Sequence, residues 1–206
     1  MLKKLITGAA IMGTLMTAGR GHSADSIQEL IRGQKTTTVD TKLMGKLAPK
    51  VGIFARNIAT IDQEEKVKTF GVVDISYPIG KGVDVVGEAQ LSPQSGFVPR
   101  VGLQYFKEEG DLSTYLASTV PLTKPFDSEN VIALQYRPKL SDSLGLFTSL
   151  ENVTNFGKEG HNFSAQKIRL GLETKGYQFG IAADLLETGK KPKVSSTIGA
   201  FVRKEF

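Results

Sequence analysis

Alternation of apolar and polar residues over segments of about ten residues limits most strongly how this chain can fold. In the segment Val83–Ser92, one set of alternate positions is apolar or small, and the other set is mostly polar. The same period of two recurs in Phe97–Lys107 and Tyr177–Leu186. This period places successive side chains on opposite faces of a β-strand. A strand of about ten residues with one apolar face has the length needed to cross a bilayer.

Similar segments fill the chain from Val51 to its last residue and predict about ten antiparallel strands in an up-and-down meander. The predicted strands are Val51–Thr60, Val67–Ile79, Val83–Ser92, Phe97–Lys107, Leu112–Val120, Asn130–Pro138, Leu144–Asn152, Phe163–Thr174, Tyr177–Leu186 and Ser195–Phe206. Hydrophobic content is 40%, and no segment after residue 24 approaches the twenty apolar residues of a membrane helix. We therefore expect an all-β fold.

The connections between these predicted strands mostly alternate in length. Those after even-numbered strands are short, such as Gly80–Gly82 and Lys175–Gly176, whereas most after odd-numbered strands are longer, notably Pro121–Glu129, Val153–Asn162 and Glu187–Val194. Membrane barrels of the outer-membrane type have short periplasmic turns and longer external loops. With both ends of the barrel in the periplasm, the odd-numbered connections would face outside the cell.

The last predicted strand ends on an aromatic residue. Its alternate positions on one face are Ile198, Ala200, Val202, Lys204 and Phe206. This ending resembles that of bacterial outer-membrane β-barrels, whose final strand commonly finishes on Phe, although Lys204 stands where an apolar or aromatic residue is usual. The resemblance implies a closed single barrel in outer-membrane lipid, with Phe206 as a signal for the barrel-assembly machinery.

The amino-terminal part divides into two further segments. Residues 1–24 combine a basic start with an apolar stretch and predict a cleaved signal peptide, with cleavage after Ser23 or Ala24. In residues 25–49, Ile27, Leu30 and Ile31 share one face of a short helix that would be followed by a linker. The barrel is then expected over residues 50–206.

Composition narrows the chemistry. The chain has no cysteine, which excludes disulfides and thiol nucleophiles. Removal of residues 1–24 leaves 23 basic and 21 acidic residues, too even a balance for nucleic-acid binding. The sequence indicates no cofactor and no metal site. One histidine, His161, follows residue 24, and it would be the centre of any enzymatic site in a long external loop. A solvated loop histidine is the expected alternative.

The polar faces of the predicted strands carry seven acidic and six basic residues. The set is Arg56, Asp74, Asp84, Glu88, Arg100, Arg137, Glu151, Lys167, Arg169, Glu173, Asp184, Arg203 and Glu205. Charges removed from water must be paired or hydrated. We therefore expect either a lumen closed by ion pairs or a narrow wet passage with opposite charges on facing walls. Arg203 and Arg56 are expected on one inner wall beside the closing seam, with Glu205 and Asp184 as the nearest acids.

These observations predict an integral outer-membrane β-barrel without enzymatic activity, which acts as a porin-like narrow passage or as a structural scaffold. A soluble exported barrel that binds an apolar ligand is the main alternative, and it would place the apolar faces inside. A barrel enzyme using His161 is a third possibility.

Overall fold

The computed structural model describes residues 25–93, 95–123, 127–191 and 193–206, so the predicted signal peptide lies outside the described residues. Twelve antiparallel strands form one closed barrel. The strands are β1 (Asp25–Gly33), β2 (Thr36–Ala48), β3 (Val51–Asp62), β4 (Val67–Gly80), β5 (Val83–Ser92), β6 (Gly96–Glu109), β7 (Leu112–Pro121), β8 (Asp127–Tyr136), β9 (Gly145–Gly157), β10 (Gly160–Thr174), β11 (Tyr177–Thr188) and β12 (Lys193–Glu205). Each strand pairs with its neighbours in sequence, which confirms the all-β meander.

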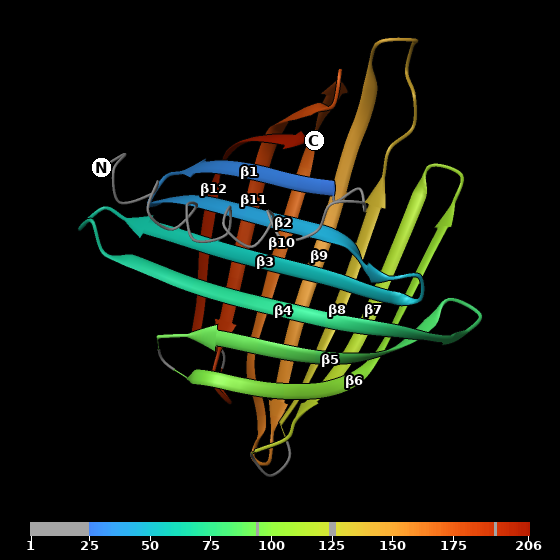
Figure 1. The fold of residues 1–206 in the computed structure, drawn as a ribbon. Coiled ribbons are helices and arrows are strands. Elements are labelled where there is room, and N and C mark those ends of the chain that lie inside the picture. The colour runs from blue at the N-terminus through green and yellow to red at the C-terminus, as the bar shows by residue number, and fades with distance from the viewer. Residues whose placement is uncertain (1–24, 94, 124–126, 192) are drawn as a thin grey trace.

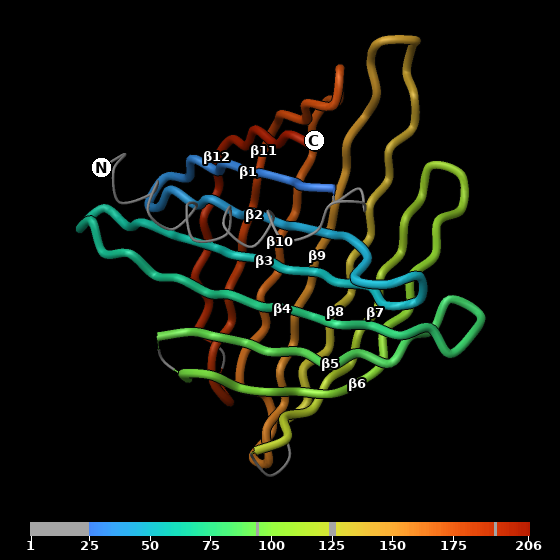
Figure 2. Tube along the Cα trace, viewed as in Figure 1, coloured from blue at the N-terminus to red at the C-terminus, as the bar shows by residue number. Residues whose placement is uncertain are grey.

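The barrel closes where β12 pairs with β1. The register runs from Ile27 opposite Glu205 to Gly33 opposite Gly199. The amide of Phe206 also donates to the carbonyl of Ser26 at 2.9 Å. Figures 1 and 2 show the blue first strand beside the red last strand, at the position of this seam. Closure leaves no unpaired sheet edge.

The prediction of a helix and linker over residues 25–49 is wrong. Residues 25–33 form β1 and residues 36–48 form β2, so the barrel has twelve strands instead of about ten. The strand places the three apolar residues that suggested a helix on two opposite faces. Ile27 and Ile31 are buried, whereas Leu30 is 49% exposed. A nine-residue segment is marginal as a helix, and here it gains two hydrogen-bonded neighbours instead.

The predicted long connections are largely strand. Residues 153–162 extend β9 and β10 to a turn at Lys158 and Glu159, with a register shift between His161 and Phe163. The longest irregular connection, residues 137–144, instead lies at the end of the barrel where β1 begins. The contrast in loop length is therefore mostly a contrast in how far the hairpins continue as strands.

The strands form a front wall and a rear wall in the view of Figure 1. β1 to β6 run across the front in Figure 1, and β7 to β12 pass steeply behind them. Inner-face glycines allow the bends between the walls. A Cβ atom at Gly102 in β6 would lie 1.9 Å from the carbonyl oxygen of Ser118 in β7, and one at Gly199 in β12 would lie 2.2 Å from that of Arg32 in β1. Only glycine permits such close backbone approach.

The outer surface carries the apolar faces of the strands. Leu91 is 59% exposed, Phe97 is 66% exposed and Ile181 is 61% exposed. Tyr77, Tyr105, Tyr136 and Tyr177 lie near the strand ends on the side where the described chain begins and ends, as an aromatic girdle does at a membrane boundary. Within the described ranges, no helix is long and apolar enough to cross a membrane.

Candidate functional site

The lumen, the space enclosed by the barrel, contains the polar faces of the strands. The soluble-barrel alternative required apolar side chains there. Arg100, Arg169 and Asp40 are instead among the most buried side chains, and the large apolar residues are mostly outside. One small apolar cluster of Ile31, Phe147, Ala182 and Phe201 fills part of the lumen near the seam. The apolar-ligand alternative is therefore wrong.

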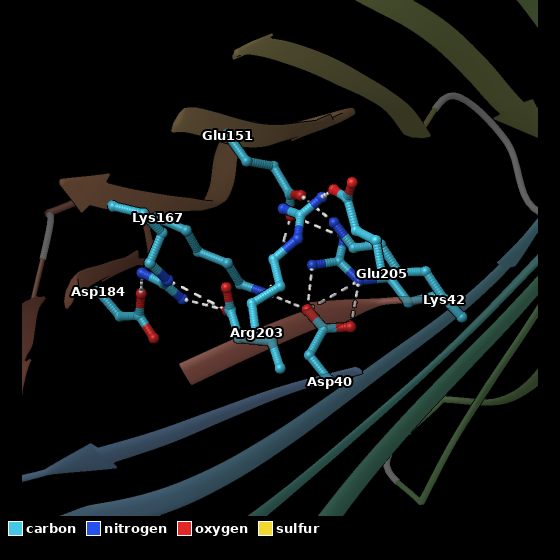
Figure 3. A network of polar contacts seen from close by, with 10 residues as sticks. Asp40, Lys42, Glu151, Lys167, Asp184, Arg203 and Glu205 are labelled. Carbon is cyan, nitrogen blue, oxygen red and sulfur yellow. Dashed lines mark hydrogen bonds and ion pairs between the residues drawn. The ribbon is translucent and has the colours of Figure 1, made fainter. Parts of the chain in front are cut away.

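A charged network crosses the lumen from the front wall to the rear wall. Arg56 on β3 donates from Nε to Asp40 on β2 at 2.9 Å, and its Nη2 lies 2.5 Å from the same carboxylate. Its Nη1 donates to Glu151 on β9 at 2.7 Å, across 95 residues of sequence. Lys42 approaches Glu151 at 3.4 Å, and Lys167 lies 3.7 Å from both carboxylates. Figure 3 shows Asp40 and Glu151 on facing strands with bases between them.

A second network follows the seam. Arg169 on β10 lies 3.1 Å from Glu29 on β1 and 2.6 Å from Asp184 on β11. Its side chain is 3% exposed. One guanidinium thus connects strands on both sides of β12, which joins the first and last parts of the chain.

A third network lies at the end of the barrel where the described chain begins and ends. Arg137, in the connection after β8, contacts both Glu173 and Glu205, the latter at 3.1 Å. Arg203 donates to Glu205 at 2.9 Å, and its guanidinium carbon lies 5.0 Å from the Phe147 ring centroid. Glu205 is therefore the acid beside Arg203, while Asp184 is bound by Arg169. Arg56 lies on β3, away from the seam, because β1 and β2 separate it from β12.

The opposite side of the lumen has one buried arginine. Arg100 on β6 donates from Nε to the Thr119 hydroxyl at 2.9 Å and from Nη2 to the Thr119 carbonyl at 2.9 Å. Its nitrogens also lie 3.3 Å from Glu88 and 3.3 Å from Asp127. These contacts hold the guanidinium at the bend between β6 and β7.

Further carboxylates lie on the same strands and on their neighbours. The Gln90 amide donates to Glu88 at 2.9 Å and to Glu129 at 2.6 Å. Asp74 on β4 is directly opposite Glu88 on β5. Asp84 accepts from Gln104 at 3.0 Å, and Gln104 in turn accepts from the Tyr115 hydroxyl at 3.3 Å.

The structure brings five charged residues into these contacts that sequence patterns did not place there. Glu29, Asp40 and Lys42 belong to the segment that was predicted as helix and linker. Asp127 and Glu129 belong to a predicted loop that is the start of β8. Together with the charged residues predicted from the sequence, these five give a set of eleven acidic and seven basic residues. The alternation of Thr38, Asp40 and Lys42 with Val39, Thr41 and Leu43 was the signal that could have identified β2.

These charges divide into two regions. We call β9 to β12 with β1 to β3 the paired region, and it has six acids and six bases, counting Arg137. We call β4 to β8 the acidic region. Its five acids are Asp74, Asp84, Glu88, Asp127 and Glu129, and its base below the rim is Arg100. Lys68 is exposed at the rim of this region.

A cavity of about 460 Å³ lies toward the end of the barrel away from the start of β1, between the acidic region and residues of β3, β9 and β10. Its lining includes the acids Asp127 and Glu129, the bases Lys68 and Arg100, the amides Gln90 and Asn155, and the aromatic Phe70. The amide of Asn155 donates to Asp127 at 2.6 Å. The cavity is thus rich in hydrogen-bonding oxygens and nitrogens.

His161 lies near the same end of the barrel. Its Nε2 is 2.8 Å from the Ser164 hydroxyl, and its Nδ1 is 3.2 Å from the carbonyl oxygen of Gly189. A serine–histidine pair needs a group that stabilises the imidazolium form, commonly a carboxylate. In the part of the chain that the structure describes, Nδ1 faces this neutral carbonyl instead. Among the same residues, no group of three His, Asp or Glu could hold a metal ion.

Solved porin structures share this fold over most of the chain. No family model and no curated relative matches the sequence. The NanC porin matches with a TM-score of 0.54 at 10% identity, over 89% of this chain and 99% of that one. The KdgM porin in complex with disordered oligogalacturonate matches with a TM-score of 0.51 at 13% identity, over 88% of this chain and 99% of that one. The chain has the β-barrel fold of these porins. The prediction of a fold of the outer-membrane porin type is therefore confirmed.

Proposed function

We propose that this porin-like barrel lies in the outer membrane and provides a narrow passage that favours small cations. In this proposal the passage follows the acidic region, and the paired region is the scaffold that holds the barrel in shape. The charge division supports the proposal most directly. Five carboxylates face one buried arginine in the acidic region, whereas acids and bases are equal in number in the paired region.

Electrostatics gives this division a functional meaning. A confined passage lined by one sign of charge raises the local concentration of counter-ions, because its low-dielectric walls focus the field. A balanced set of charges within hydrogen-bond distance has little net field, and its members are already bound to one another. The paired region therefore offers a permeating ion little attraction.

The same reasoning disfavours acidic sugars as solutes. The KdgM porin binds oligogalacturonate, a polymer that carries carboxylates. In this chain the cavity has no excess of positive charge, because the carboxylates of Asp127 and Glu129 lie beside the bases Lys68 and Arg100. Small neutral solutes fit this lining, because its oxygens and nitrogens exchange hydrogen bonds with them.

The orientation and assembly of the barrel follow from the same proposal. Both ends of the described chain lie at the end of the barrel that bears the tyrosine girdle, which we assign to the periplasm. Phe206 points outward with 66% exposure, where the barrel-assembly machinery and lipid could contact it. Outer-membrane fractionation with heat-modifiable gel mobility tests the location.

The function is tested by single-channel recording in a planar bilayer with a salt gradient. We expect a small conductance and a reversal potential that shows preference for K⁺ over Cl⁻. The double variant that combines Asp84→Asn and Glu129→Gln should reduce that preference. The single variant Glu173→Gln, in the paired region, should leave it unchanged. Anion preference would contradict the proposal. A barrel that is correctly inserted but does not conduct would show that the protein is a structural scaffold and not a passage.

A further inference from the structure

Asp74 is a buried carboxyl group without a compensating partner. The residue is 7% exposed, and among the described residues no hydrogen-bond donor reaches its Oδ1. The buried bases of the lumen that the structure describes form their ion pairs with other acids. An isolated charge that is removed from water is costly, and a carboxyl group in this position commonly keeps its proton instead.

The neighbours of Asp74 in the sheet are one acid and one apolar residue. Glu88 on β5 lies directly opposite, and Phe54 on β3 lies opposite on the other side. Directly opposite side chains have Cβ atoms about 4.5–5.5 Å apart, close enough for two carboxylates to repel each other. Arg56 is the next inward residue of β3, but its guanidinium is bound in the cross-lumen network. The front wall therefore favours the neutral form of Asp74.

The opposite wall adds no base beside Asp74. The ionisable groups that interact with Asp74 and Glu88 across the lumen are Glu129 on β8 and Tyr115 on β7. Glu129 is an acid, and it shares the Gln90 amide with Glu88. The Tyr115 hydroxyl is uncharged at ordinary pH. Neither group can compensate a negative charge on Asp74.

Glu88 is placed to accept a hydrogen bond from a protonated Asp74. Arg100 on β6 lies opposite Glu88, so Glu88 stands between one acid and one base. Its contacts with Arg100, the Gln90 amide and the Thr119 hydroxyl are all made through Oε1. Oε2 takes part in none of these three contacts, so it remains to accept from Asp74. Arg100 stabilises Glu88 as the carboxylate, and one proton on Asp74 then satisfies both carboxyl groups.

We propose that Asp74 and Glu88 form a proton-binding site of the passage, in which Asp74 carries the proton and donates it in a hydrogen bond to Glu88. Release of this proton as the pH rises adds one negative charge to the acidic region, and the added charge increases the preference for cations. The effect on selectivity rests on the proposed cation passage, whereas the proton site stands on the contacts of Asp74 and Glu88.

Infrared spectroscopy of the barrel in detergent tests the proton site without any measurement of conduction. A protonated carboxyl group has a carbonyl stretching band that is separate from the bands of carboxylates. Asp and Glu side chains in water are ionised above about pH 6, so a band that disappears only between about pH 6 and about pH 9 reports a retained proton. We expect this band in the parent barrel. Asp74→Asn should abolish it, because the amide can donate to Glu88 but has no proton to release.

Two further variants make the infrared test specific. Asp184→Asn is the matched control, because Asp184 is paired with Arg169, and it should leave the band unchanged. Glu88→Gln removes the like charge opposite Asp74 and should move the loss of the band to lower pH by about one unit or more. This variant provides the test if Asp74→Asn does not fold, and an unchanged titration would show that the two carboxyl groups do not share a proton. Heat-modifiable mobility verifies folding.

Single-channel recording tests the effect on selectivity. The preference of the parent for K⁺ over Cl⁻ should rise between about pH 6 and about pH 8, and Asp74→Asn should abolish this rise. Histidine ordinarily titrates in the same range. His161→Gln is therefore the second control, and it should keep the rise, because His161 contacts Ser164 and Gly189 instead of the two carboxyl groups.

The outcomes separate the proton site from the passage. A parent barrel without the infrared band, or a band that persists in Asp74→Asn, would overturn the proton site even if the barrel conducts cations. A band that depends on Asp74 in a conducting barrel whose selectivity ignores pH would overturn the effect on selectivity. The same band in a barrel that does not conduct would keep the proton site and remove the passage.

Discussion

The paired region and the acidic region of the lumen use the same residue types in opposite ways. In the paired region, Arg56, Lys167 and Arg169 each bridge two acids from different strands. In the acidic region, Arg100 is bound mainly within the bend between β6 and β7, and Asp74 keeps an unpartnered oxygen. The comparison shows that burial of charge alone does not distinguish a scaffold from a site. We infer that the balance between acidic and basic partners distinguishes them.

The difference has an energetic consequence. Removal of one member of a buried ion pair leaves the other without compensation, which is strongly destabilising. Removal of a charge that has no compensating partner relieves repulsion and loses little. The two regions should therefore respond to similar substitutions with opposite changes in stability and in ion selectivity.

The largest effect is expected for Arg56→Ala. This change leaves Asp40 and Glu151 facing each other across the lumen with only Lys42 and Lys167 nearby. We expect the free energy of unfolding to fall by about 3–5 kcal/mol, measured from urea unfolding of the barrel in lipid or detergent. Lys190→Ala is the control, since its exposed pair with Glu159 should contribute only about 0–1 kcal/mol. Similar small losses in both variants would show that the cross-lumen network is not structural.

A matched pair of carboxylates sharpens the comparison. Asp40→Asn weakens the three hydrogen bonds from Arg56, and we expect a loss of about 1.5–3 kcal/mol in the free energy of unfolding. Asp74→Asn removes a charge without a partner and should leave stability unchanged or raise it by up to about 1 kcal/mol. Urea midpoints of the two variants provide the test. A greater loss at Asp74 than at Asp40 would reverse the roles that we assign to the two regions.

Neighbouring residues on β12 give the smallest contrast. Arg203 points into the lumen toward Glu205 and Phe147, but Glu205 keeps its contact with Arg137. Arg203→Ala should therefore cost about 1–2 kcal/mol. Lys204 points outward, 3.9 Å from the Tyr177 ring centroid, and Lys204→Ala should cost less than about 1 kcal/mol. A larger effect at Lys204 in the same urea experiment would contradict the inside-outside assignment of this strand.

Much of the fold could be predicted from the sequence because a membrane barrel has a strict local pattern. Val83–Ser92 and Tyr177–Leu186 alternate with a period of two, and both lie within strands close to the predicted bounds. The first hairpin could not be found in the same way. Ile27, Leu30 and Ile31 fit the helical period as well as they fit a strand, and only pairing with β2 and β12 decides between the two structures.

The candidate site was less accessible to prediction. The polar faces identified many of the charged side chains, but the missed segments held Asp40, the main partner of Arg56, and Glu129. These omissions made the inner charge seem balanced and concealed its division into two regions. Partners such as Arg56 and Glu151 come from facing walls, so their contact depends on the distance between the two walls. No local pattern in the sequence encodes that distance.

The division of the lumen can be tested most directly by single cysteines, since the chain contains none. Ser76→Cys places a thiol on the inner face of β4 in the acidic region, and Ser149→Cys places one on the inner face of β9 in the paired region. Each variant is treated with a cationic thiol-reactive reagent during single-channel recording. We predict that modification at position 76 blocks the current and that modification at position 149 is slow or leaves the current unchanged. Faster block at position 149, or equal block at both positions, would contradict a passage confined to the acidic region.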